Sequence, residues 1–266
     1  MEEEFKMNRS LWDEWTDINA RSKMYGMEAF KQGENKLDAL IRSEVGDVAG
    51  KTLLHMQCHF GMDTLSWARL GARVTGVDFS PRAIELATSL SRELEIPARF
   101  LCSNIYDLPE LLDEQFDIVF ASYGVINWLP DFPRWMEIAA RFVKPGGCFY
   151  LAEGHPIMWI FDEEAESWTL KYPYFQKEFM VCEEQGSYAD RTAELQTTSC
   201  YQWQHTLGEI VTEVCRNDLR LEFLYEFGRG FFPIMPTMRE EDDGFWHLPD
   251  GDDRLPLVFS IKAWKK

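Results

Sequence analysis

Residues 51–80 read KTLLHMQCHFGMDTLSWARLGARVTGVDFS, and this stretch decides the fold of the chain. The apolar run 52–56 predicts a buried parallel strand, and residues 62–70 predict the helix that follows it. Residues 74–77 predict a second strand, which ends on Asp78. Strand, turn, helix, strand and acid form the βαβ unit that binds nucleoside cofactors, and the acid is placed to accept hydrogen bonds from ribose hydroxyls.

The turn at residues 57–61 contains a single glycine, Gly61. A dinucleotide-binding turn has three glycines, because the pyrophosphate approaches bare backbone there. Gln57 and His59 occupy two of these three positions. The turn therefore favours a nucleoside cofactor without phosphates, such as S-adenosylmethionine (SAM), over NAD or FAD.

Two longer runs carry a resemblance to a known family: LLHMQCHFGMDTLSWARLGARVTGVDFSPRAIELA and FDIVFASYGVINWLPDFPRWMEIAARFVKPGG. They resemble the class I SAM-dependent methyltransferases, and most closely a bacterial subgroup with Gln-Cys-His-Phe-Gly in the first motif. The resemblance extends over residues 50–155, and His55 stands where the family has an acid. It implies SAM as cofactor, S-adenosylhomocysteine as product, and a last strand that runs antiparallel beside the fifth.

The motif matches and strand ends predict ten cofactor-binding residues: Tyr25, Gln57, Cys58, His59, Gly61, Asp78, Phe79, Asn104, Ile105 and Ser122. Asn104 stands where the family has an Asp that accepts a hydrogen bond from the adenine amino group. Its side-chain carbonyl can accept the same bond, although a turn asparagine explains it nearly as well. Tyr25 is included because N-terminal segments in this family often fold over the cofactor as a lid.

Three residues near strand ends are predicted to act in catalysis: His155, Glu153 and Tyr123. Ligands of such sheets lie outside the carboxyl ends of the strands. A histidine with a pKa near 6.5 can accept a proton at neutral pH, and a structural histidine is an equal alternative. His205 is a further candidate base. No metal site is predicted, because the six cysteines are scattered without a C-x-x-C pair.

The order of elements predicts an α/β fold, a doubly wound, Rossmann-like, seven-stranded and mostly parallel sheet with an inserted antiparallel β element. We expect an N-terminal helical lid at 1–49, a SAM-binding domain at 50–155 and 206–266, and a substrate-side insertion at 156–205. The aromatic residues of the insertion line a pocket, form its own core or build a dimer face. The acidic stretches 240–243 and 250–253 are expected to be solvated loops.

Composition narrows the choice of partner. The net charge of −18 disfavours nucleic acid, whose phosphate backbone needs a basic surface. The sequence shows no apolar run of membrane-spanning length and no apolar leader, so we expect a cytoplasmic protein. The predicted function is methyl transfer to a small-molecule acceptor, with a homodimer left open. The alternatives are a SAM-binding regulatory or partner protein without catalysis, and a methyltransferase that acts on RNA or protein.

Overall fold

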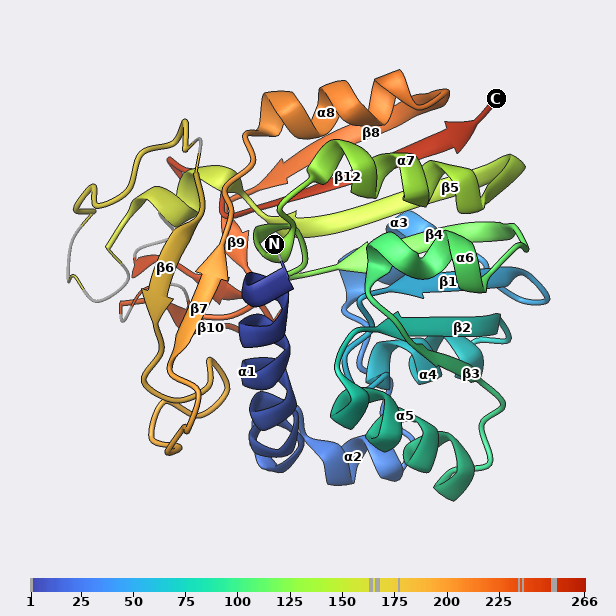
Figure 1. Cartoon of the computed structure of the whole chain (residues 1–266), viewed down its shortest axis with the longest axis horizontal. Helices are drawn as coiled ribbons and strands as arrows, with labels where there is room; N and C mark the ends of the chain where they lie inside the picture. Colours follow the sequence, from blue (N-terminus) through green and yellow to red (C-terminus); the bar gives the residue numbers. More distant parts are fainter. Residues whose placement is uncertain are drawn as a thin grey trace.

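The structure is a computed structural model that describes residues 2–162, 165, 168–176, 178–233, 235, 237–249 and 253–266. A seven-stranded sheet forms its centre (Figure 1). In spatial order its strands are β3 (Arg99–Cys102), β2 (Arg73–Asp78), β1 (Thr52–Met56), β4 (Phe116–Ser122), β5 (Val143–Gly154), β12 (Val258–Lys265) and β8 (Leu219–Phe227). Neighbouring strands are parallel from β3 to β5, whereas β12 runs antiparallel to both β5 and β8. The predicted doubly wound, mostly parallel sheet is therefore confirmed.

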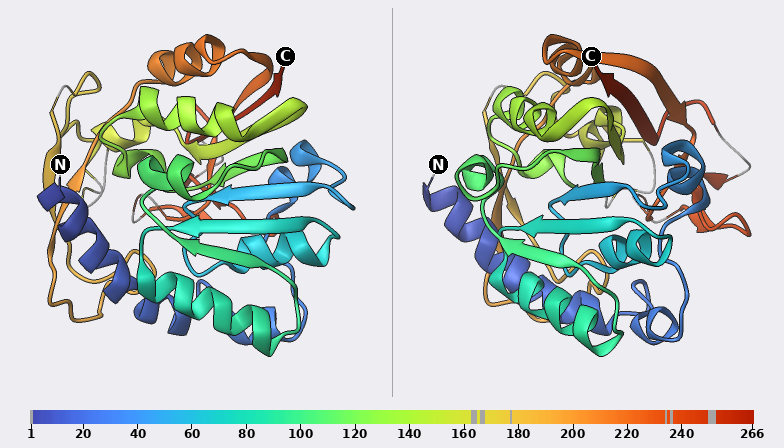
Figure 2. Two further views of the ribbon diagram at one scale, coloured as in Figure 1. Left: turned by 45° about the vertical axis from the view of Figure 1, so that its right-hand side comes forward. Right: turned by 90° about the vertical axis from the view of Figure 1, so that its right-hand side faces the viewer.

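Helices cover both faces of this sheet (Figure 2). On one face lie α6 (Leu108–Leu111), α7 (Phe132–Phe142) and α8 (Leu207–Arg216). On the other lie α3 (Ala39–Val45), α4 (Met62–Arg69) and α5 (Pro81–Glu93), and α2 (Met27–Lys31) packs against α4 and α5. Alternate residues of the central strands enter the two cores, so that Val119 faces α7 and Phe120 faces α3 and α4. Burial on both faces explains why these strands are continuously apolar in sequence.

Local end signals in the sequence predict where two helices begin. Ser80 caps α5 by accepting a hydrogen bond from the Ala83 amide, and Pro81 occupies the first helical position. Thr206 and Glu209 form a reciprocal capping box at the start of α8. Short 3-10 turns also follow three strands: η1 (Ile105–Asp107), η2 (Ile126–Trp128) and η3 (Pro156–Ile160).

The insertion contains a separate antiparallel pair, β6 (Met180–Glu183) and β7 (Ser199–Gln202). The helix α1 (Glu2–Arg21) runs between this pair and the carboxyl ends of the central strands (Figure 1). Asn8 joins α1 to β7, because its side chain exchanges two hydrogen bonds of 2.8 Å with the backbone of Tyr201. The N-terminal helix and the β6–β7 pair thus lie together over the carboxyl ends of the central strands.

A second small sheet differs from the sequence prediction. β9 (Arg229–Gly230), β10 (Arg239–Glu240) and β11 (Trp246–His247) form an antiparallel sheet that the sequence did not predict. Residues 241–243 of the first acidic stretch form the exposed turn between β10 and β11, as expected. Strands of two residues are too short to show a hydrophobic period, so the sequence carried no signal for them. Asp250–Asp252 of the second acidic stretch lie outside the described residues.

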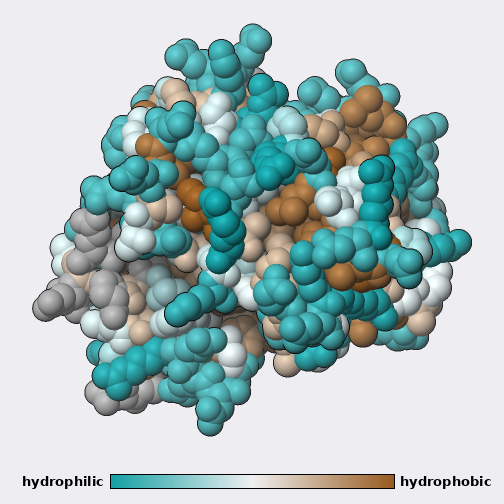
Figure 3. All heavy atoms as spheres, turned by 90° about the horizontal axis from the view of Figure 1, so that it is seen from below, coloured by the Kyte–Doolittle hydropathy of each residue, from teal (hydrophilic) through white to brown (hydrophobic). Residues whose placement is uncertain are grey.

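Hydrophilic residues cover most of the surface seen in Figure 3, and hydrophobic residues gather in patches between them. Among the described residues, no helix is both long and apolar enough to cross a lipid bilayer.

Candidate active site

The turn after β1 keeps the backbone of a glycine-rich turn although two glycines are absent. Gln57, His59 and Gly61 all have positive φ, at 54°, 51° and 76°. A left-handed backbone costs a non-glycine residue about 1–2 kcal/mol, so tertiary contacts must hold Gln57 and His59 in place. Gln57 accepts a 2.8 Å hydrogen bond from the Trp135 indole, and the His59 ring lies beside Tyr25 and Trp12.

Asp78 lies at the end of β2, where its carboxylate organises the same turn. One oxygen accepts a 2.8 Å hydrogen bond from the His59 amide, and the other accepts a 2.9 Å bond from the Ser80 amide. The side chain is buried, and burial raises its pKa from 3.8 to about 6 against the lowering effect of these amides. Each carboxylate oxygen has a second lone pair, so the group can still accept hydrogen bonds from two hydroxyls.

All ten predicted cofactor residues line one cavity of about 1080 Å³, which also has Tyr123 in its wall. Asn104 faces this cavity and makes a local turn as well, since its side-chain oxygen accepts a 3.2 Å hydrogen bond from the Tyr106 amide. Because a carbonyl oxygen has two lone pairs, this side chain can support the turn and accept a hydrogen bond from a ligand as well. His55 is buried and hydrogen-bonded to Thr64, and burial lowers its pKa to about 3, so the imidazole is neutral. A neutral ring replaces the family's acid at this position.

Two of the three predicted catalytic residues do not line the cavity. The Glu153 carboxylate accepts hydrogen bonds from the amides of Gly124, Val125 and Ile126, and so fixes the loop after β4. His155 caps η3 through its Nδ1 atom, and its Nε2 atom lies 3.0 Å from Glu226. These contacts support structural roles for both side chains.

His205, the further candidate base, is also absent from the cavity wall and lies 2.8 Å from the Leu129 carbonyl through Nε2. Tyr123 does face the cavity. Its φ is 43°, and its hydroxyl donates a 2.8 Å hydrogen bond to Asp38. Asp38 in turn caps α3 by accepting a hydrogen bond from the Ile41 amide. Asp38 had no motif signal, because its partner lies 85 positions away in sequence.

Asp63 is a second acidic residue that sequence reasoning did not assign to the site. It lies in the first turn of α4, lines the cavity, and has no hydrogen-bond or ion-pair partner among the described residues. Burial and the nearby Asp38 raise its pKa to about 7, while Lys36 opposes this effect. A carboxylate at the start of α4 repels a phosphate and attracts an ammonium group.

The groups at this end of the cavity fit SAM. Asp78 provides acceptors for ribose hydroxyls, Asn104 an acceptor for an amino group, and Asp63 a partner for an α-ammonium group. The side chains of Phe79 and Ile105 supply apolar surface for a base. The pyrophosphate of a dinucleotide would instead meet Asp63 and the side chains of the turn.

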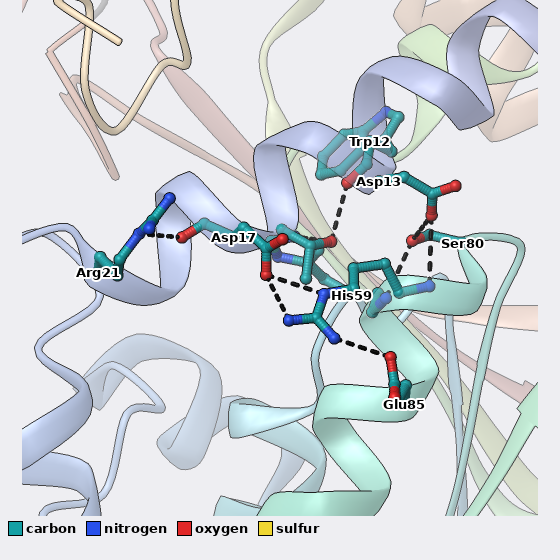
Figure 4. Close-up of polar contacts among 10 residues, drawn as sticks. Trp12, Asp13, Asp17, Arg21, His59, Ser80 and Glu85 are labelled. Atoms are coloured by element: carbon teal, nitrogen blue, oxygen red, sulfur yellow. Dashed lines mark hydrogen bonds and ion pairs between the residues drawn. The ribbon is translucent and has the colours of Figure 1, made fainter.

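The helix α1 lies over the same end of the cavity. Figure 4 shows Asp13 and Asp17 of α1 pointing toward the start of α5. Ser80 donates a hydrogen bond to Asp13, and Arg82 forms an ion pair with Asp17. Trp12 packs edge to face against His59, with ring centroids 5.2 Å apart, and also lines the cavity.

A hydroxyl cluster links the turn to the insertion. The hydroxyl of Tyr25 lies 3.2 Å from Nδ1 of His59, and it also contacts the hydroxyl of Tyr188. Burial lowers the pKa of His59 to about 3, so the ring is neutral and can accept a hydrogen bond. Three distant segments therefore meet at the hydroxyl of Tyr25.

Comparison with known proteins agrees with this geometry. Residues 54–151 match the family described as a methyltransferase domain. A ubiquinone biosynthesis O-methyltransferase of a Methylobacterium species is 34% identical over 105 residues, which are 40% of this chain and 41% of that protein. The chain thus spans about two fifths of the length of the curated relatives that it matches.

Solved structures share the fold over most of the chain. A SAM-dependent methyltransferase from Mesorhizobium loti is 18% identical, with a TM-score of 0.59 over 88% of this chain and 100% of that one. A glycopeptide N-methyltransferase complexed with SAM is 15% identical, with a TM-score of 0.54 over 84% of this chain and 90% of that one. The family match and the fold support the expectation of SAM as cofactor. The narrower bacterial subgroup, the cytoplasmic location and the homodimer stay predictions.

Proposed function

We propose that this chain is a SAM-dependent methyltransferase that acts on a small-molecule acceptor. The observation that carries the proposal is a single cavity of about 1080 Å³ that extends from Asp78 and the turn after β1 to an aromatic end beyond Tyr123. Pockets for one small ligand usually enclose about 300–1000 Å³. The cavity is therefore large enough for a methyl donor and an acceptor side by side.

In this proposal each polar group of the cofactor end has one task. Asp78 accepts hydrogen bonds from the ribose hydroxyls, Asn104 accepts one from the adenine amino group, and Asp63 pairs with the ammonium of the methionine part. When bound, SAM would supply a methyl group that is activated by its positively charged sulfur. A lone pair of the acceptor would attack the methyl carbon in line with the carbon–sulfur bond, and the sulfur would leave with the bonding electrons. Because the methyl group is already activated, the chain's main tasks are to align the two ligands and to exclude water.

The helix α1 and the insertion exclude water from the cavity. Trp12 and Trp15 of α1 and Tyr188 of the insertion line the cavity and pack against one another edge to face or tilted. A strong catalytic base is needed only if the acceptor must lose a proton. Since the relatives are named as O-methyltransferases, an oxygen acceptor is the first class to test for this chain.

Calorimetric titration of the purified chain with SAM, and separately with NADH, tests the proposal. We expect micromolar binding of SAM and no binding of NADH. Binding of NADH without SAM would indicate a dehydrogenase and would contradict the proposal. Saturable formation of S-adenosylhomocysteine with a metabolite would then exclude a SAM-binding protein without catalysis.

A further inference from the structure

A row of aromatic rings builds the end of the cavity that lies away from the predicted cofactor residues. Tyr123 stacks on Phe231, with ring centroids 4.0 Å apart and an interplanar angle of 15°. Phe231 contacts Phe232 at 4.8 Å, and Phe232 stacks on Trp159 at 6.3 Å. We name these four residues the aromatic row. All four line the cavity, and they join β4, η3 and the segment that follows β9.

Most of the remaining wall at this end is apolar. Met158, Met235, Phe245 and Trp246 face the same cavity, and Lys171 and Glu240 are the charged residues beside them. Gly154 lets the Trp159 indole lie against the end of β5, because a Cβ atom at position 154 would come within 2.9 Å of that indole. The absence of a side chain at Gly154 thus leaves the space that the Trp159 ring occupies.

Polar groups occur at two defined places along the row. At one end, the Tyr123 hydroxyl donates to Asp38, and the Asp38 carboxylate also faces the cavity. At the other end, Nε1 of Trp159 is buried, so a ligand in the cavity meets this indole through its carbon atoms. An apolar surface with a carboxylate acceptor at one end suits a flat ligand with a polar group on one edge.

We propose that the aromatic row is the acceptor subsite, and that it binds a neutral aromatic compound with a hydroxyl group. The flat body of the acceptor lies against the row, and its hydroxyl donates a hydrogen bond to Asp38 beside Tyr123. This inference rests on the proposed methyltransferase function, because it assigns the second half of the same cavity.

The hydrogen bonds of Asp38 favour a neutral ligand over a cation. The carboxylate already accepts hydrogen bonds from Tyr123 and from the Ile41 amide, and burial raises its pKa against the lowering effect of these bonds and of Arg229. Arg229 itself pairs with Asp243 at 3.1 Å. Asp38 therefore offers a cation only a compensated carboxylate, while its oxygens keep lone pairs that can accept a hydrogen bond from a neutral hydroxyl.

Calorimetric titration of the full-length chain with 2-naphthol, in the presence of saturating SAM, tests the subsite. We expect binding that Phe231→Ala weakens at least tenfold. Phe175→Ala is the matched control, because this phenylalanine is 77% exposed and does not line the cavity, and we expect no change. Trp246→Ala gives a second test of the apolar end if Phe231→Ala does not fold.

The role of Asp38 has its own readout. The wild-type chain should bind 2-naphthol at least tenfold more tightly than 2-methoxynaphthalene, which has no hydroxyl proton to donate. Asp38→Asn should lose this preference while α3 stays capped, because asparagine caps helices as well as aspartate does. Retention of the preference in Asp38→Asn would overturn the assignment of this carboxylate.

Failure of the subsite and failure of the proposed function give different results. Binding of SAM without any binding of 2-naphthol would overturn the subsite alone. Absence of SAM binding would overturn the methyltransferase, and with it the subsite as part of that enzyme. Tighter binding of phenyltrimethylammonium than of 2-naphthol would show that the row recognises cations, which also contradicts the inference.

Discussion

The hydroxyl of Ser80 donates a 2.5 Å hydrogen bond to the Asp13 carboxylate and so connects the N-terminal helix α1 to the first turn of α5. The same hydroxyl accepts a bond from the Ala83 amide, and Asp13 also accepts a bond from the Arg82 amide. Ser80 follows Asp78 by two positions, so the contact lies directly beside the predicted ribose site. The N-cap of α5 is thereby coupled to the position of α1, the helix that covers the cavity.

We expect Asp13→Ala to speed the dissociation of SAM by about tenfold. Hydrogen bonds to charged groups contribute about 1.5–3 kcal/mol, and about 1.4 kcal/mol corresponds to a factor of ten. Stopped-flow displacement of SAM measures the rate. Glu85→Ala is the control, because Glu85 is exposed and pairs with Arg82 on the surface of α5, so the rate of this variant should match that of the wild type. An unchanged rate in Asp13→Ala would show that α1 does not move for ligand exit.

The affinity for SAM should fall as the pH drops through about 6. Burial raises the pKa of Asp78 from 3.8 to about 6, so the ionised form that accepts both ribose hydroxyls is populated above that pH. The same shift makes the free protein less stable as the pH rises from 3.8 to about 6, because the folded state holds this proton more tightly than the unfolded state.

Calorimetric Kd values from pH 5 to 8 would test this dependence in an Asp63→Asn background. That substitution removes the other titrating carboxyl of the cavity, whose pKa is about 7. Adding Asp78→Asn to this variant should remove the remaining inflection in the plot of the SAM Kd against pH. An inflection near 6 that survives in the double variant would rule out Asp78 as its source.

We expect Gln57→Gly to be more stable than Gln57→Ala by about 1 kcal/mol. Both variants remove the acceptor of the Trp135 indole, so the comparison isolates the backbone. Gln57 has a φ of 54°, which glycine adopts freely and alanine adopts at a cost of about 1–2 kcal/mol. Urea unfolding monitored by circular dichroism measures the difference. Equal free energies of unfolding would mean that the turn relaxes to another conformation.

Replacement of Glu153 should lower the free energy of unfolding more than it lowers kcat. In Glu153→Gln an amide N–H₂ group would replace one carboxylate oxygen and face either the Gly124 amide or the amides of Val125 and Ile126, and we expect a loss of about 3 kcal/mol in the free energy of unfolding. Glu137→Gln is the control, because Glu137 is exposed and forms a surface pair with Arg134. A normal unfolding curve with a much lower kcat would instead restore Glu153 as a proton acceptor.

The sequence by itself determined the elements whose signals are local. The βαβ unit, the position of Asp78 at the end of its strand, and the caps at Ser80 and Thr206 all follow from residues within a few positions of one another. Parallel strands buried on both faces need continuous apolar runs, and such runs are easily recognised. These local signals, together with the family resemblance that suggested Tyr25 and Asn104, predicted ten cavity-lining residues.

Only the tertiary structure decided which of the other polar residues face the cavity. Glu153 ends a strand at the correct edge, yet its carboxylate accepts hydrogen bonds from the loop after β4 instead of lining the cavity. Asp38 and Tyr123, and likewise Tyr25 and Tyr188, meet across 85 and 163 positions. Such contacts depend on how helices and insertions pack over the sheet, and no short-range period or capping preference encodes that packing.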